Sequence, residues 1–176
     1  MNYPAIYTSN IDYQSILTST EIAEISHEFE QFETRQACSI DALKIVQKHR
    51  GWISDDVLFA IADFLQMSTA ELESVATFYN LIYRRPVGEY VIHICDSISC
   101  YLTGYESALA AIKSHLKIDY GETTEDGKFT LLSNACLGNC DKAPAMMIAD
   151  QHYTHLTEES VIQILNSYQE KGRSNE

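Results

Sequence analysis

The hydrophobic residues in the first half of the chain recur every three or four positions. This spacing places apolar side chains on one face of an α-helix, and it predicts four helices between residues 18 and 86. Two of them begin with a capping box, formed by Thr18 with Glu21 and by Ser68 with Glu71. The apolar positions that define the four helices are Ile22, Ile25, Phe29 and Phe32; Ile40, Leu43 and Val46; Val57, Ile61, Phe64 and Leu65; and Val75 and Phe78.

The ends of these helices are also marked in the sequence. The first helix is expected to run to about Glu33, and Gly51 is expected to stop the second in a left-handed conformation. Ser54 is the expected cap of the third helix, because its hydroxyl can accept a backbone N–H from the first turn. The first half is therefore predicted to be a small helical domain.

After Gly88 the hydrophobic pattern becomes that of a small sheet with helices. Runs of β-branched and aromatic residues predict strands over residues 90–94, 128–132 and 145–149, with a hairpin partner over 153–156. A helix is expected over 105–116 and a last one after Thr157, with turns at Asp126-Gly127 and Asp150-Gln151. The predicted fold class is α+β, divided into a flexible N-terminal tail (1–17), a helical domain (18–86), a sheet domain (87–171) and a C-terminal tail (172–176).

Charge excludes one large class of partners. The chain has 176 residues, with 12 Lys and Arg against 25 Asp and Glu, which gives a formal net charge of −13. Both halves are acidic, with 12 acidic and 6 basic residues up to position 86 and 13 and 6 after it. Either half would repel a nucleic-acid backbone, so no nucleic-acid partner is expected.

The expected compartment decides what the cysteines can do. No apolar run approaches the roughly 20 residues that a membrane span needs, so no direct span is expected. Arg35 is the first basic residue, which does not fit a secretory or organellar leader, and the chain is expected in the cytoplasm. In that reducing compartment several cysteines indicate metal binding or catalysis rather than structural disulfides.

Four of the five cysteines form two closely spaced pairs. Cys95 and Cys100 are separated by four residues, Cys136 and Cys140 by three, and each pair is expected in a loop that follows a strand. Structural zinc most often uses tighter Cys-x2-Cys spacing, whereas longer loops wrap more readily around an iron–sulfur core, so the spacing favours a cluster over zinc. Gly138 lies inside the second pair and would let backbone amides approach sulfur.

The remaining cysteine and three histidines are interpreted as structural. Cys38 lies far along the chain from either pair and is expected to be a buried thiol that the site does not need. His93 falls in a predicted strand, and His152 and His155 flank the predicted hairpin. None of the three is required as a ligand, because four cysteines already complete the set for a [2Fe–2S] cluster.

Several segments together resemble one protein family. They are Ser74-Val75-Ala76-Thr77-Phe78-Tyr79, Pro86-Val87-Gly88, the Cys95–Cys100 segment and Cys136-Leu137-Gly138-Asn139-Cys140-Asp141-Lys142-Ala143-Pro144. Over most of its length the chain is similar to the thioredoxin-like [2Fe–2S] subunits of bacterial respiratory NADH:quinone oxidoreductase (complex I). The resemblance implies a helical bundle followed by a thioredoxin-like ferredoxin domain with one [2Fe–2S] cluster. It also implies that Cys95 and Cys100 bind one iron and that Cys136 and Cys140 bind the other.

The resemblance implies an oxidoreductase subunit with no complete active site and no catalytic residue of its own. None of the seven glycines forms Gly-x-Gly or Gly-Lys-Ser/Thr, so no nucleotide-binding fingerprint is present. NADH gives up two electrons as a hydride and a cluster takes one, so a flavin must lie between them. In the family, FMN and NADH belong to a neighbouring subunit of the peripheral arm, at the cytoplasmic face of the inner membrane. That subunit and other peripheral-arm subunits are the expected partners.

Two alternatives remain open from the sequence. The first is the homologous small subunit of an NAD-linked formate dehydrogenase or hydrogenase, which has the same fold and cluster. The second is a zinc-stabilised interaction module without a redox role, which would be colourless and indifferent to dithionite.

Overall fold

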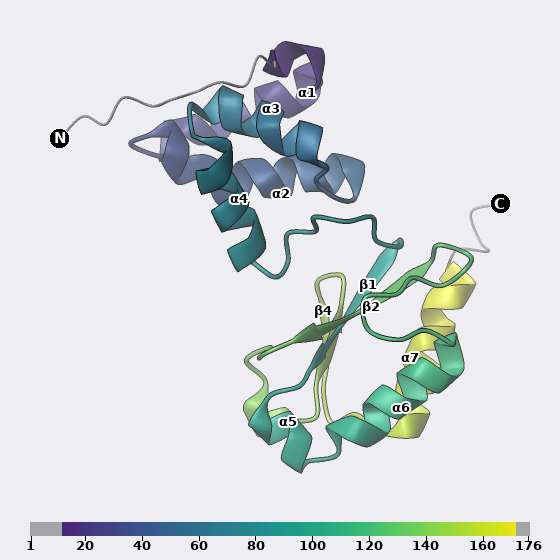
Figure 1. The fold of residues 1–176 in the computed structure, drawn as a ribbon. Helices are drawn as coiled ribbons and strands as arrows, with labels where there is room; N and C mark the ends of the chain where they lie inside the picture. The colour runs from purple at the N-terminus through teal and green to yellow at the C-terminus, as the bar shows by residue number, and fades with distance from the viewer. Residues whose placement is uncertain (1–11, 172–176) are drawn as a thin grey trace. The chain divides into compact units, whose positions relative to one another are not determined.

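The structure is a computed structural model that describes residues 12–171, and it divides into two compact units between Pro86 and Val87 (Figure 1). Each unit has a hydrophobic core of its own. The first unit consists of helices, and the second is built on a sheet.

The helical unit contains four α-helices: α1 (Ser19–Glu28), α2 (Ser39–Arg50), α3 (Asp55–Leu65) and α4 (Thr69–Phe78). Short 3-10 turns occupy Tyr13–Ser15, Phe29–Gln31 and Arg35–Cys38. The predicted helix starts are confirmed, because both capping boxes are complete and the Ser54 hydroxyl accepts the N–H of Val57. Each such cap stabilises its helix by about 1 kcal/mol.

The first helix ends earlier than predicted, at Glu28 rather than near Glu33. Phe29–Gln31 tighten into a 3-10 turn, and Phe32 is extended with φ −124° and ψ 146°, which ends the helical path. Both Phe29 and Phe32 still pack against the core. The second helix stops at Gly51 as predicted, with a positive φ of 82°.

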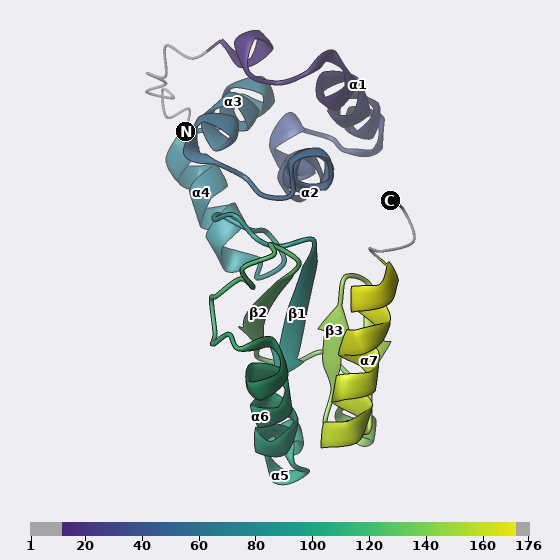
Figure 2. The same ribbon diagram turned by 90° about the vertical axis from the view of Figure 1, so that its right-hand side faces the viewer.

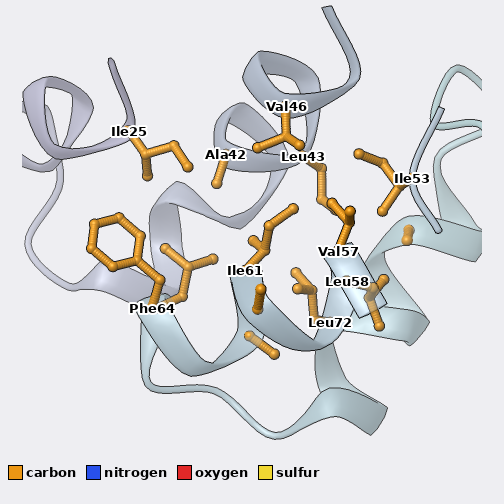
Figure 3. Packing of buried hydrophobic residues seen from close by; sticks show 14 of the residues in the cluster. Ile25, Ala42, Leu43, Val46, Ile53, Val57, Leu58, Ile61, Phe64 and Leu72 are labelled. Atoms are coloured by element: carbon orange, nitrogen blue, oxygen red, sulfur yellow. The ribbon is translucent and has the colours of Figure 1, made fainter. Parts of the chain in front are cut away.

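Helix α3 lies in the middle of the helical core (Figure 3). Seven of its eleven residues are buried, so it packs on several sides at once. In the second helix, Ile40 is only half-buried, against the prediction that it belongs to the buried stripe, and Ala42 is buried instead, beside Leu43 and Val46. The side chains that α3 packs against include Ile25, Leu43, Val46, Ile53 and Leu72.

A buried ion pair joins α1 to α2. The Glu21 carboxylate, 1% exposed, accepts hydrogen bonds of 2.6 Å from both Nε and Nη2 of Arg50. Arg50 also donates to the backbone carbonyl of Ile16 at 2.7 Å. Burial by itself would raise the pKa of Glu21, but the hydrogen bonds from Arg50 and Thr18 hold that pKa below its ordinary value.

Part of the expected N-terminal tail lies within the described residues. Leu17 is buried in the helical core, and the ring of Tyr13 lies 4.8 Å from the ring of Phe64. Residues 1–11 and the expected C-terminal tail, 172–176, lie outside the described residues.

The second unit is a four-stranded sheet with two longer helices on one face (Figures 1 and 2). Its strands are β1 (Tyr90–Cys95), β2 (Phe129–Asn134), β3 (Met146–Ile148) and β4 (Gln151–Tyr153), in the order β2-β1-β3-β4. β1 is parallel to β2 and antiparallel to β3, and β3 is antiparallel to β4. Helices α6 (Tyr105–Leu116) and α7 (Glu158–Lys171) bury Ile92, Leu131, Ile148 and their neighbours against that face. The predicted α+β class is confirmed.

Two segments of this unit differ from the prediction. Residues Ile98–Leu102 form a short helix, α5, where a loop was expected, because the N–H of Tyr101 donates to the carbonyl of Ser97 at 2.9 Å and closes a helical turn. The last strand runs over Gln151–Tyr153 rather than over 153–156, because the hairpin turns at Ala149 and Asp150 rather than at Asp150-Gln151, with Ala149 at a φ of 50°.

Candidate metal centre

Four cysteines meet at one end of the sheet. Cys95 is the last residue of β1, and Cys100 lies on α5, which follows that strand (Figure 1). Cys136 lies just beyond the end of β2, and Cys140 begins the 3-10 turn Cys140–Lys142. Because β1 and β2 are parallel neighbours, with Cys95 paired to Asn134, both segments leave the sheet at the same edge. We refer to these four residues as the four-cysteine site.

The sulfur atoms of the four-cysteine site lie close to one another. The Sγ atoms of Cys136 and Cys140 are 3.7 Å apart. The thiol of Cys95 interacts with the thiol of Cys100 and with the thiol of Cys136. Ser99 on α5 interacts with the thiol of Cys140, so the two segments meet at a second point. The structure thus brings together all four cysteines singled out from the sequence.

The two pairs differ in their surroundings. Cys95 and Cys100 are 2% and 1% exposed and are buried with Ala145, whereas Cys136 and Cys140 are exposed. Burial, followed by the neighbouring Cys95 thiol, raises the pKa of Cys100 to about 11. The backbone N–H of Gly138, followed by the Cys140 thiol, lowers the pKa of Cys136. Cys136, on the exposed side, is therefore the more readily deprotonated of these two thiols, and it is the thiolate form of cysteine that binds metals.

Gly138 has the role that the sequence suggested. Its φ of 78° lies in the left-handed region, which a glycine adopts without steric cost. The turn that follows from this directs the Gly138 N–H at the sulfur of Cys136, at 3.4 Å. A backbone N–H that donates a hydrogen bond to a sulfur ligand stabilises negative charge on that sulfur.

Asn139 connects the exposed cysteine pair to the β3–β4 hairpin. Its side-chain amide donates to Nδ1 of His152 on β4 at 2.7 Å and to the carbonyl of Leu137 at 3.2 Å. From the sequence, His152 is interpreted only as a residue that the site does not need as a ligand. Its contact with Asn139 could not be predicted, because nothing in the local sequence pattern pairs two residues from separate segments.

The other cysteine and histidines considered from the sequence have surroundings of their own. Cys38 is buried in the helical core, where burial, followed by the charges of Asp41 and Glu28, raises its pKa. His93 is buried within β1, and burial lowers its pKa to about 4, so the ring is neutral at pH 7. The backbone N–H of His155 donates to the carbonyl of Lys142 at 2.8 Å.

The donor set suits an iron–sulfur cluster. Two thiolates on one tetrahedral metal, at metal–sulfur distances of about 2.3 Å, lie roughly 3.8 Å apart, and the sulfurs of Cys136 and Cys140 are 3.7 Å apart. Among residues 12–171, no three His, Cys, Asp or Glu side chains surround one point closely enough to hold a single metal ion. Two pairs of thiols, one from each segment, match the two protein ligands that each iron of a [2Fe–2S] cluster needs.

A row of exposed apolar side chains lies on the helix that carries Cys100. Ile98, Tyr101 and Leu102 are 67%, 54% and 75% exposed. Cys100, on the same short helix, is buried, so the helix presents one face to the cysteines and another to solvent. Large apolar side chains grouped in this way mark interaction surfaces.

Comparison with known proteins connects this geometry to a protein family. Residues 23–169 match the thioredoxin-like [2Fe–2S] ferredoxin family. The NADH-quinone oxidoreductase subunit that is designated E in Salmonella typhimurium is 49% identical over 152 residues, covering 86% of this chain and 92% of the relative. The protein of the same name from Pseudomonas aeruginosa is 47% identical over 153 residues, covering 87% of this chain and 92% of the relative.

A solved structure with the same fold is an NAD+-reducing [NiFe]-hydrogenase in the H2-reduced state. It matches with a TM-score of 0.61 and 21% identity, over 72% of this chain and 22% of the hydrogenase chain. At that identity the likeness concerns the fold alone.

Proposed function

Because the chain belongs to the thioredoxin-like [2Fe–2S] ferredoxin family, we propose that its four-cysteine site holds one [2Fe–2S] cluster. Cys95 and Cys100 bind one iron, and Cys136 and Cys140 bind the other. The observation that carries this assignment is the convergence of two thiol pairs at one edge of the sheet, with 3.7 Å between the sulfurs of the second pair.

The residues around the site prepare it for an anionic group. The cluster and its four thiolates carry a formal charge of about −2, which becomes about −3 on reduction. The N–H of Gly138, directed at the sulfur of Cys136, stabilises that charge on the exposed side. On the other side, the burial of Cys95 and Cys100 keeps water from their sulfurs.

The chain is proposed to act as the [2Fe–2S] electron-transfer subunit of an NADH:quinone oxidoreductase. Relatives that are named as one subunit of that enzyme align with this chain over 92% of their own length. When bound, a [2Fe–2S] cluster takes up and returns one electron at a time, here in exchange with FMN on a partner subunit during NADH oxidation. This chain contributes the cysteine ligands, the amide that faces them and a surface for the partner.

The partner is proposed to be the FMN- and NADH-binding subunit, joined by other peripheral-arm subunits. A docking surface near the site is supported by the exposed side chains of Ile98, Tyr101 and Leu102 on α5. Because Cys100 lies on the same helix, a partner that binds α5 would lie close to the cluster. No helix of the described residues is long and apolar enough to cross a membrane. The proposed location is the cytoplasmic face of the inner membrane, through association with a membrane-bound complex.

Cysteine variants test the proposed ligands. Cys136→Ala is expected to abolish cluster retention, because one iron would lose half of its protein ligands. Cys38→Ala is the matched control: it removes the one cysteine of the helical core, and its iron and sulfide content should equal that of the wild-type chain. Equal iron content in both variants would contradict the ligand assignment.

Reduction by NADH tests the proposed function. The cluster-loaded chain alone is expected to be unreactive toward NADH, whereas NADH should reduce it when the FMN-bearing subunit is added. Co-purification should recover quinone-reducing and membrane-arm subunits with the chain. Recovery of a formate dehydrogenase or hydrogenase subunit in their place would overturn the assignment to complex I.

A further inference from the structure

One aromatic side chain belongs both to the core of the sheet unit and to the wall of the four-cysteine site. Tyr105 packs against the buried group of Cys95, Cys100 and Ala145. Its ring also packs against the main core between the sheet and the two long helices. It is the first residue of α6, which begins directly after Gly104, where a φ of 105° reverses the chain behind α5.

The hydroxyl of Tyr105 is fixed by a second tyrosine. The two hydroxyl oxygens of Tyr105 and Tyr120 are 2.5 Å apart, a hydrogen bond between the first residue of α6 and a residue that follows the end of this helix. Tyr120 is held in turn, because the ammonium group of Lys113 lies 4.9 Å from the centre of its ring and pairs with Asp119 at 2.6 Å. The Tyr105 side chain is therefore tethered at its hydroxyl end while it packs against the buried cysteines.

We propose that Tyr105 is a positioning residue that closes the buried side of the four-cysteine site to water, and that Tyr120 holds it in place. This inference rests on the proposed function. Water beside an anionic cluster stabilises the reduced form, which carries the larger negative charge. A closed wall on the Cys95–Cys100 side thus lowers the reduction potential and slows the loss of iron.

The first test removes the ring. In the cluster-loaded chain, Tyr105→Ala should raise the midpoint potential enough to change the reduced-to-oxidised ratio at least tenfold at a fixed potential, which is 59 mV for one electron. It should also speed the loss of iron to a chelator. Tyr79→Ala is the control, because Tyr79 is an exposed tyrosine of the helical unit and does not belong to the group that packs on the buried cysteines. A wild-type potential in Tyr105→Ala, or equal shifts in the two variants, would overturn the proposal.

The second test removes only the tether and keeps both rings. Tyr105→Phe and Tyr120→Phe each delete the same hydrogen bond, so each should speed iron loss by the same factor, and the double variant should be no faster than either. Rates that multiply in the double variant, or a Tyr120→Phe rate equal to wild type, would contradict the tether. Tyr120 does not belong to the group that packs on the buried cysteines. If it did not act through its hydrogen bond to Tyr105, its substitution would not change iron loss in this non-additive way.

Failure of the role proposed for Tyr105 can be distinguished from failure of the proposed function. If the wild-type chain holds no iron and sulfide, the proposed function fails before any variant is compared. If the wild-type chain holds the cluster and the tyrosine variants match it in potential and in iron loss, the role of Tyr105 alone fails.

Discussion

The side-chain amide of Asn139, which lies between Cys136 and Cys140, donates a hydrogen bond of 2.7 Å to Nδ1 of His152 on β4. The segment that carries the exposed cysteine pair is thereby tied to the sheet. A ligand loop that is fixed before metal binding loses less conformational freedom when the metal binds.

His152→Ala should loosen the exposed cysteine pair. A hydrogen bond of this kind contributes about 1 kcal/mol, so iron release to a chelator is expected to be roughly fivefold faster than in the wild-type chain. His27→Ala replaces an exposed histidine of α1 and should leave the rate unchanged. The role of His152 is refuted if both variants release iron at the wild-type rate.

A comparison of Gly138→Ala with Gly121→Ala separates the cost of backbone strain from the effect of the Gly138 N–H on the reduction potential of the cluster. The two glycines have φ of 78° and 77°, and a Cβ on either would meet nothing within 4 Å, so both substitutions should cost about 1–2 kcal/mol of stability. Gly138→Ala alone should lower the reduction potential, because it displaces the N–H that faces Cys136. Identical potentials in the two variants would rule out that hydrogen bond as a determinant.

The ion pair of Glu21 and Arg50 should make the helical unit sensitive to acid. Because the folded-state pKa of Glu21 lies below its ordinary value of 4.5, the unfolded chain takes up the proton first as the pH falls. The stabilisation is fully present above about pH 4.5 and is lost as the pH falls through the folded-state pKa.

Glu21→Gln tests this dependence in the cluster-free chain. Its free energy of unfolding at pH 7, measured with denaturant, should be about 2 kcal/mol lower than that of the wild-type chain, and the difference should shrink in acid. Glu30→Gln, at an exposed position, should change it by less than about 0.5 kcal/mol. A Glu21→Gln difference that stays constant down to pH 3 would exclude the pair as the source of the acid sensitivity.

Leu102→Glu should weaken the proposed association with the FMN-bearing subunit. Leu102 is 75% exposed, so the substitution leaves the fold intact while it places a charge in the docking surface on α5. The dissociation constant is expected to rise about tenfold or more, whereas Ile162→Glu on α7 should leave it unchanged. Equal dissociation constants for the two variants would contradict the proposal that the partner binds α5.

The features that could be predicted from the sequence are those that depend on near neighbours along the chain. The capping boxes of Thr18 and Ser68 involve residues three positions apart, and α6 has its predicted bounds because its apolar spacing is regular. Cys95, Cys100, Cys136 and Cys140 stand out in the sequence because metal-ligand spacing is itself a local pattern.

The features that the sequence does not reveal depend on packing or on unusual backbone conformations. Helix α5 is too short to show a hydrophobic period, and the position of β4 depends on a positive φ at Ala149, a conformation rarely adopted by alanine. The contacts of Asn139 with His152 and of Tyr105 with Tyr120 join residues from different elements. They become visible only once the sheet and its helices are assembled.

The most direct test of the account is the metal content of the purified wild-type chain, with an EPR spectrum after reduction. The account predicts about two irons and two acid-labile sulfides per chain, and a rhombic S = 1/2 signal that appears when dithionite adds one electron. Stoichiometric zinc without iron, in a colourless chain that dithionite does not change, would contradict it.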